Sequence, residues 1–172
     1  MPELREEDPY AKRWVMVPEA APLLFQGGLD TRLKSFQVAV VRLQIELETI
    51  FSEASPEHIL ICHRGTLDAL AYWLRNGWAE ADFFARTKMS QEEHFKRYSG
   101  VLRLQTTTIR AEQAYRRLPD AHRKEDASEA AEIDCFCSAS WGQHPKYSMI
   151  ENGSRTGNQL PTSARPASTL QK

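Results

Sequence analysis

The stretch Ile59-Leu60-Ile61-Cys62-His63-Arg64-Gly65-Thr66-Leu67-Asp68 passes directly from four apolar residues to charged residues and a glycine. The apolar part predicts a short buried strand, and the residues from Leu67 onward return to helical spacing. A strand that ends in charged residues before a helix is typical of open α/β sheets, in which ligands bind at the carboxyl ends of the strands. An arginine at that place, Arg64, can direct two N–H groups at a phosphate or a carboxylate.

Outward from this stretch, the chain alternates between strand and helix patterns. Strands are predicted over residues 14–17, 58–62, 101–105 and 147–150, and helices over 33–52, 67–74, 109–117 and 127–141, with one or two more within 78–98. Strands that alternate with helices favour right-handed crossovers and a mainly parallel sheet, so the predicted fold class is α/β. The predicted organisation is a flexible arm over 1–13, one domain over 14–152, and a disordered tail over 153–172.

The longest helix has the clearest pattern. Its apolar residues recur at steps of three and four, which predicts a buried stripe, while Gln44 and Glu48 are expected off that stripe. Asp30 or Thr31 is the expected N-terminal cap. The predicted stripe consists of Leu33, Phe36, Val40, Leu43, Leu47 and Ile50.

Composition and charge exclude several classes of protein. Of the 172 residues, 41% are hydrophobic and 26% are charged, as in an ordinary globular domain. The net charge of −1 provides no overall attraction to nucleic acid or to an anionic membrane. No apolar run approaches the roughly 20 residues that span a bilayer, and residues 1–13 lack the apolar core of a signal peptide. The three cysteines are expected to be reduced thiols in the cytoplasm.

Several short motifs, taken in order, resemble one known family. The family is the AAA-type ATPase and nucleotide-kinase-like P-loop NTPase family, that of the NadR kinase domain and the TRP-channel translocation-defect ATPase. The resemblance covers about residues 14–152. The motifs are Val17-Pro18-Glu19-Ala20-Ala21 with Leu24-Phe25 and Gly27-Gly28, then 61–68 with Ala71-Tyr72-Trp73, then Tyr98 to Leu104 with Thr106, and finally Tyr115, Arg123, Glu125, Glu129-Ala130 and 141–145.

This resemblance implies a three-layer P-loop fold that binds ATP or GTP with Mg²⁺ and an acceptor, with phosphoryl transfer or hydrolysis as its chemistry. Three departures bear on that activity. No G-x-x-x-x-G-K-[ST] loop occurs in the 172 residues, whereas the family places this loop upstream of Trp14. The family's Asp-Arg-Gly at the strand end reads His63-Arg64-Gly65 here, and residues 153–172 replace a further helix.

The resemblance also suggests roles for individual residues. Arg64 and Arg123 correspond to phosphate-binding arginines, and Glu19, His63 and Asp68 are the candidate catalytic residues. Plainer interpretations stay open for each arginine and for Glu19. Arg64 could pair with Asp68 and Arg123 with Glu125 or Asp126 on the surface, while Glu19 could serve only as a carboxylate at a helix N-terminus. His63 is a poor magnesium ligand and is expected to pack, neutral, at the strand end.

Two rival kinds of site are disfavoured. A zinc site would need ligands on one face, but Cys62 and His63 point to opposite faces of a strand, and Cys135 and Cys137 do not share a helix face. No metal-ligating residues are therefore predicted. The basic stretch between Arg110 and Lys124 lacks the interleaved aromatics of an RNA-binding surface, so it is interpreted as a solvated, lid-like face.

Three hypotheses follow. The first is a degenerate or N-terminally truncated member of the family that binds nucleotide weakly or not at all. The second is an active kinase or ATPase whose start lies upstream of Met1, and the third is a non-catalytic interaction module. In the first, the missing strand belongs between the strands that end near Cys62 and Gln105, so apolar edges should be exposed and stability should be marginal.

Overall fold

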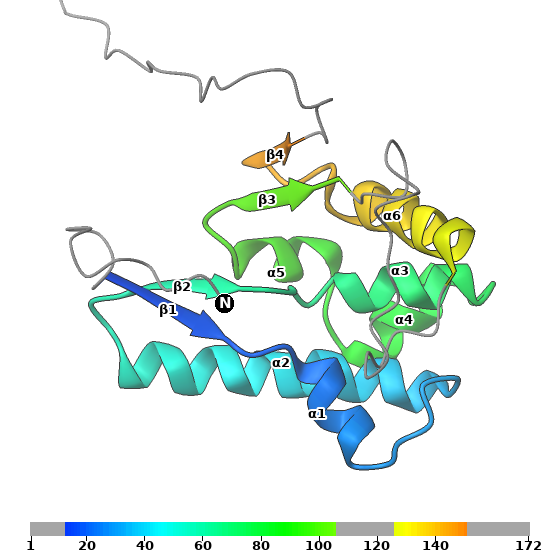
Figure 1. The fold of residues 1–172 in the computed structure, drawn as a ribbon, viewed down its shortest axis with the longest axis horizontal. Helices are drawn as coiled ribbons and strands as arrows, with labels where there is room; N and C mark the ends of the chain where they lie inside the picture. The colour runs from blue at the N-terminus through cyan, green and yellow to red at the C-terminus, as the bar shows by residue number, and fades with distance from the viewer. Residues whose placement is uncertain (1–12, 106–125, 151–172) are drawn as a thin grey trace, which may run out of the picture.

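The computed structural model describes residues 13–105 and 126–150. The order of elements alternates between strands and helices, as predicted (Figure 1). The described residues leave out the predicted helix over 109–117, Arg123, the predicted tail, and all of the predicted arm except Arg13. The elements are β1 (Trp14–Val17), α1 (Ala20–Gln26), α2 (Lys34–Ala54), β2 (Ile59–Cys62), α3 (Asp68–Arg75), α4 (Glu80–Thr87), α5 (Gln91–Lys96), β3 (Val101–Leu104), α6 (Ala127–Trp141) and β4 (Tyr147–Ile150).

The strands form two parallel pairs. β1 pairs with β2 in the register Trp14 to Ile59, and β3 pairs with β4 in the register Val101 to Tyr147. The prediction of parallel strands in an α/β fold is therefore confirmed. Within the described residues, the two pairs are separate sheets, and β2 is not hydrogen-bonded to β3. The single continuous sheet implied by the family resemblance is not formed by these strands alone.

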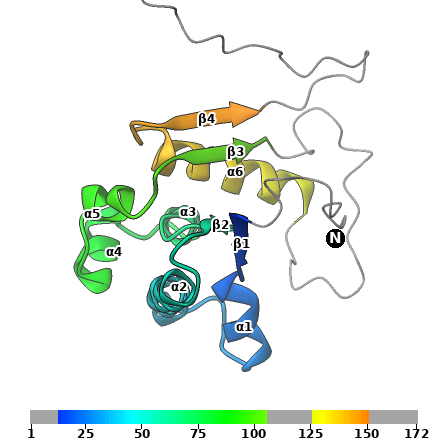
Figure 2. The same cartoon turned by 90° about the vertical axis from the view of Figure 1, so that its left-hand side faces the viewer.

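Helices cover one face of each strand pair. α2 packs against β1 and β2, and α6 lies beneath β3 and β4 (Figure 2). Side chains on the covered face are mostly less exposed: Val17 is 1% exposed, whereas Met16 on the opposite face is 46% exposed. The strand over 59–62, predicted to be buried, is only partly so, since Ile59 is 54% exposed. The exposed apolar side chains on the strands include Trp14, Met16, Ile59, Leu102, Leu104 and Ile150.

The core is built around α3. This helix packs between α2 and α6, and its Leu70 and Trp73 are fully buried against Val41 of α2 and Trp141 of α6. Trp73 also stacks edge-to-face on Phe83 of α4, with ring centroids 5.6 Å apart. Asn76 caps α3, and Gly77 follows at φ +73°, a left-handed conformation that glycine adopts without strain.

The orientation of α2 differs from the predicted one. Leu33 and Ile50, at the ends of the predicted stripe, are 52% and 56% exposed, while Gln44 and Glu48 are buried. The expected cap is also wrong. α2 starts at Lys34 without a side-chain cap, and the Asp30 carboxylate instead accepts hydrogen bonds from its neighbour Arg32. Gln44 accepts the backbone N–H of Ala20 at 3.3 Å, which explains its burial. Glu48 accepts hydrogen bonds from Arg97 and Tyr98, in the turn after α5.

None of the described helices has both the length and the apolar character that crossing a membrane requires.

Candidate functional site

The predicted site residues of β1 and β2 meet at the carboxyl ends of these strands. Val17 and Cys62 are register partners in the parallel pair, so the residues that follow them leave the sheet side by side. Glu19 follows β1 and His63 follows β2. The His63 Nδ1 atom lies 3.1 Å from Glu19 Oε2, and Arg64 Nε lies 3.7 Å from Glu19 Oε1. The structure therefore brings Glu19, His63 and Arg64 together at the carboxyl ends of β1 and β2.

Asp68 completes this group from the first turn of α3. Arg64 Nη1 donates to Asp68 Oδ1 at 3.1 Å, which is the local pair that the sequence left open as the plainer interpretation. The other carboxylate oxygen accepts the backbone N–H of Gly65 at 2.6 Å, and the Cys137 thiol of α6 lies 3.7 Å from Oδ1. Asp68 thus ties the loop after β2 to two helices, which is a structural function in itself.

The electrostatics of the group favour a permanently charged Arg64. Burial opposes the charged form, but the surrounding groups, Asp68 foremost and Glu19 among them, outweigh it and raise the pKa of Arg64. Two carboxylates and one guanidinium leave the group with a charge of −1 when His63 is neutral. A phosphate approaching Arg64 therefore meets an arginine whose charge is already neutralised.

The side chains of His63 and Glu19 face each other at the ends of β2 and β1. His63 is not packed at the strand end, because its side chain is 61% exposed. Glu19 occupies the N-cap position of α1, yet its side chain makes no capping hydrogen bond, since it faces His63 and Arg64 instead. The catalytic roles of Glu19, His63 and Asp68 stay predictions, and Arg123 lies outside the described residues.

A buried polar network supports the loop after β2 from within the domain. The backbone N–H of Thr66 donates to the Tyr98 hydroxyl at 2.8 Å, and this hydroxyl donates to Glu48 of α2 at 2.7 Å. Glu48 also accepts from Arg97 at 2.7 and 3.0 Å and from Gln44 at 3.1 Å. A buried carboxylate is stable only when paired and hydrogen-bonded, and these donors supply both conditions. Sequence reasoning missed this network, because its members are about fifty residues apart.

His94 of α5 joins the network at Thr66. Its Nδ1 atom lies 2.8 Å from the Thr66 hydroxyl, and its ring lies against Phe83 and Phe84. The residue is fully buried, and among the described residues its Nε2 atom has no hydrogen-bond partner. Burial, followed by the charge of Arg97, lowers the pKa of His94 to about 4, so the ring is neutral at neutral pH.

Cys62 is not an activated nucleophile. Burial and the nearby Glu48 carboxylate raise the pKa of its thiol to about 12, which keeps it protonated. The described residues also contain no three His, Cys, Asp or Glu side chains that converge as metal ligands. The strand-end residues fit Mg²⁺ poorly, since His63 offers a nitrogen ligand and Arg64 competes for both carboxylates.

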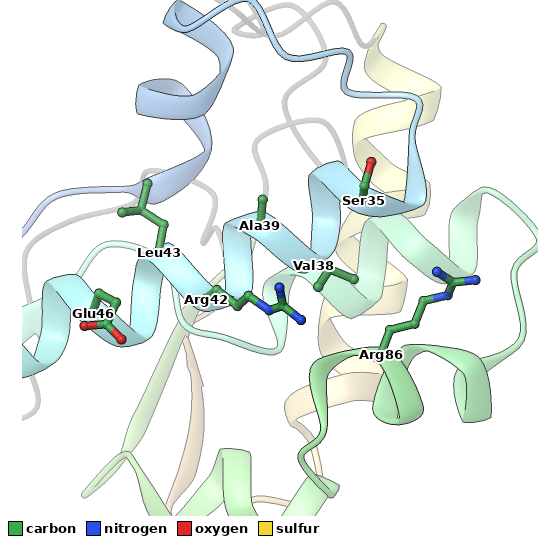
Figure 3. A pocket seen from close by; sticks show the side chains of 7 residues that line it. All are labelled: Ser35, Val38, Ala39, Arg42, Leu43, Glu46 and Arg86. Carbon is green, nitrogen blue, oxygen red and sulfur yellow. The ribbon is translucent and has the colours of Figure 1, made fainter.

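Two surface grooves lie away from these residues. One, of about 500 Å³, is formed by the exposed side of α2 around Arg42 together with Arg86 of α4 (Figure 3). The other, of about 550 Å³, lies between Phe25 and Arg32 on one side and Arg75 and Glu129 on the other. Neither groove is lined by a predicted site residue. The candidate functional site is therefore assigned from the residues at the strand ends and not from these grooves.

Comparison with known proteins identifies the family. A family model described as an AAA domain matches residues 3–156. The chain belongs to this AAA domain family. No curated protein and no solved structure matches the chain. The match confirms the AAA and P-loop NTPase part of the resemblance, and it identifies the family as one of nucleotide-binding domains. In the AAA domain described here, the cluster of Glu19, His63, Arg64 and Asp68 is the part that the family resemblance connects with nucleotide chemistry.

Proposed function

We propose that this AAA domain is a degenerate member of its family that binds nucleotide weakly, through side chains at the carboxyl ends of β1 and β2. Arg64 carries the proposal. It stands at a strand end, where α/β folds bind ligands, but two carboxylates already neutralise it. The 172 residues contain no Gly-rich loop whose amides and lysine would hold the phosphates. Affinity for phosphate must then come from this single engaged arginine and from Arg123.

The finer family assignment belongs to the same proposal. A relationship to the NadR kinase domain and the TRP-channel translocation-defect ATPase would make ATP or GTP the ligand, with Mg²⁺ and an acceptor. His63 argues against efficient metal-assisted transfer, because it stands where the family has a carboxylate and imidazole suits Mg²⁺ poorly. We therefore propose binding without efficient turnover.

The proposal also includes a further strand, which is absent from the described residues. One further parallel strand between β2 and β3 would join the two described pairs into one sheet. Helices on the strand faces that α2 and α6 leave open would complete three layers and cover exposed side chains such as Met16 and Leu104. The separation of the two pairs supports this interpretation. Such a strand and its Gly-rich loop would come from residues other than those described here.

Isothermal titration of the chain with ATP and GTP, each with and without Mg²⁺, tests the proposal. We expect dissociation constants in the high micromolar to millimolar range, with little change on adding Mg²⁺. Arg64→Ala should abolish the heat, and Arg42→Ala, which removes an exposed arginine of the same charge from α2, should not. Tight binding that strengthens with Mg²⁺ would refute degeneracy and favour an active kinase or ATPase.

An interaction module is the second candidate function. The specific observation in its favour is the exposed apolar face of the strands, where Leu102 and Leu104 are 64% and 67% exposed. Contiguous apolar surface of this kind often marks a contact with another protein. No heat at millimolar nucleotide, from a sample shown to be folded, would favour this candidate over nucleotide binding.

A reducing compartment suits either function, and we propose the cytoplasm. The described cysteines Cys62, Cys135 and Cys137 are free. Burial raises the pKa of Cys137 to about 12, as it does for Cys62, so these two remain thiols.

A further inference from the structure

Arg64 holds its two carboxylate partners with unequal strength. Asp68 is fixed by three contacts, because it accepts from Arg64 and from the Gly65 N–H and lies beside the Cys137 thiol. Among the described residues, Glu19 has only the contact with the exposed His63 and an ion pair with Arg64 at 3.7 Å. At 3.7 Å the Arg64 Nε to Glu19 Oε1 contact is too long for a hydrogen bond. Asp68 is thus the permanent partner of Arg64, and Glu19 is the replaceable one.

The backbone around Glu19 permits its side chain to move. Glu19 has extended dihedrals, φ −74° and ψ 128°, and its carboxylate does not cap α1. Rotation of the side chain would break neither a helix cap nor a strand hydrogen bond. The loop on the other side of the contact is fixed, since Thr66 and Gly65 are held by Tyr98 and Asp68. Any rearrangement at Arg64 therefore has to start with Glu19.

We propose that Glu19 is an internal anion that competes for Arg64 and so sets the affinity of this strand end for polyphosphate ligands. The inference rests on the proposed function, because it concerns the same arginine. The guanidinium has five N–H donors, and among the described residues the bond to Asp68 is its only hydrogen bond. When the Glu19 side chain swings away, the side of the guanidinium that it faced becomes available to a phosphate oxygen.

The negative charge of Glu19 determines whether its removal strengthens or weakens the binding of polyphosphate. With Glu19 in place, the group carries −1 when His63 is neutral, and a polyphosphate is repelled. Without the Glu19 charge the group is neutral, with Arg64 anchored by Asp68 alone. Glu19 therefore has the opposite role from a catalytic carboxylate. Neutralising Glu19 should strengthen polyphosphate binding, whereas neutralising a catalytic carboxylate would reduce activity.

Glu19→Gln tests the inference because it removes the charge and keeps the shape. The matched control is Glu57→Gln, which makes the same change of net charge at an exposed residue before the opposite end of β2. The probe is inorganic tripolyphosphate without Mg²⁺, measured by isothermal titration on the full chain. We expect Glu19→Gln to bind about tenfold more tightly than the wild type. Glu57→Gln should match the wild type, and Glu19→Gln with Arg64→Gln should lose the gain.

The inference is overturned if Glu19→Gln binds tripolyphosphate no more tightly than Glu57→Gln, or if the gain persists without Arg64. A second titration with ATP separates this inference from the proposed function. If ATP binds Glu19→Gln more tightly than tripolyphosphate does, the result supports both the competition by Glu19 and the proposed nucleotide binding. If the tripolyphosphate gain is present but ATP adds nothing to it, competition by Glu19 stands and nucleotide recognition fails.

Discussion

Tyr98→Phe is the most direct test of the buried network behind the strand end. The change removes one oxygen that accepts the Thr66 N–H at 2.8 Å and donates to Glu48 at 2.7 Å. Burial, and then the charge of Glu48, raises the pKa of the Tyr98 hydroxyl, so it acts as a neutral donor at every relevant pH. Phenylalanine keeps the ring and its edge-to-face contact with Trp141, where the centroids are 5.2 Å apart.

The expected loss of stability comes from the groups that lose their hydrogen-bond partner in Tyr98→Phe. Thr66 is 1% exposed, so its N–H cannot turn to solvent, and an orphaned buried donor costs about 1–3 kcal/mol. Glu48 loses one donor but keeps Arg97 and Gln44, which adds a smaller penalty. We expect the free energy of unfolding to fall by about 3 kcal/mol. With a urea slope of about 1–3 kcal/mol/M, the midpoint should move down by about 1–3 M.

Urea denaturation followed by tryptophan fluorescence and circular dichroism measures this loss. The control is Thr49→Val on the same helix, α2, where an exposed hydroxyl donates only within its helix and its removal should change stability by less than about 0.5 kcal/mol. Hydrogen exchange at the Thr66 amide should also quicken in Tyr98→Phe. A loss below about 0.5 kcal/mol, with Thr66 still protected, would refute the reasoning, because it would mean that another acceptor replaces the hydroxyl.

Three further changes probe other parts of the domain. The lowered pKa of His94 means that unfolded chains bind more protons than folded ones between about pH 6.5 and pH 4. The free energy of unfolding should therefore fall as the pH drops through this range. Urea titrations at several pH values should show that His94→Gln loses this part of the pH dependence. Gly65→Ala should destabilise by about 1–3 kcal/mol in the same assay, because its Cβ would lie 2.7 Å from the Trp141 ring; Gly100→Ala, whose Cβ would lie 3.6 Å from the nearest atom, should be nearly neutral. Leu104→Lys should reduce self-association in sedimentation velocity without lowering the melting temperature, and unchanged association would show that the open strand face is not responsible.

Local patterns in the sequence predicted most of the elements. Each described strand and α3 to α6 followed from runs of apolar residues, helical spacing and turn residues such as Asn76-Gly77. Asp126 forms a capping box with Glu129 at the start of α6. No helix was predicted over Ala20–Gln26, the residues that form α1. Pro22 is in fact the third residue of α1, where a helix does not use the backbone N–H, so proline is tolerated there.

Features that depend on distant partners could not be predicted in the same way. Gln44 and Glu48 look like a solvated face of α2. Their burial makes sense only once the Ala20 N–H is brought against Gln44, and Arg97 and Tyr98 against Glu48. At the strand ends, the Arg64–Asp68 pair was foreseeable because it spans one helical turn. The contact of Glu19 with the residues after β2 required the parallel register of β1 and β2.

The arginine–carboxylate groups around Glu48 and around Glu19 differ in a way that bears on function. Glu48 and Arg97 are locked into a buried network whose other members hold Thr66, so they fix the position of the loop after β2. Glu19 and Arg64 form a longer contact at the rim, with an exposed histidine as the only other partner of Glu19 among the described residues. A ligand at the strand ends therefore meets a rigid backbone and one movable carboxylate. Binding should consequently change the environment of Glu19 and His63, while the amide of Thr66 keeps its protection from exchange. A chemical-shift titration with tripolyphosphate that moved Thr66 and Tyr98 as strongly as His63 would contradict this division between a fixed support and a movable rim.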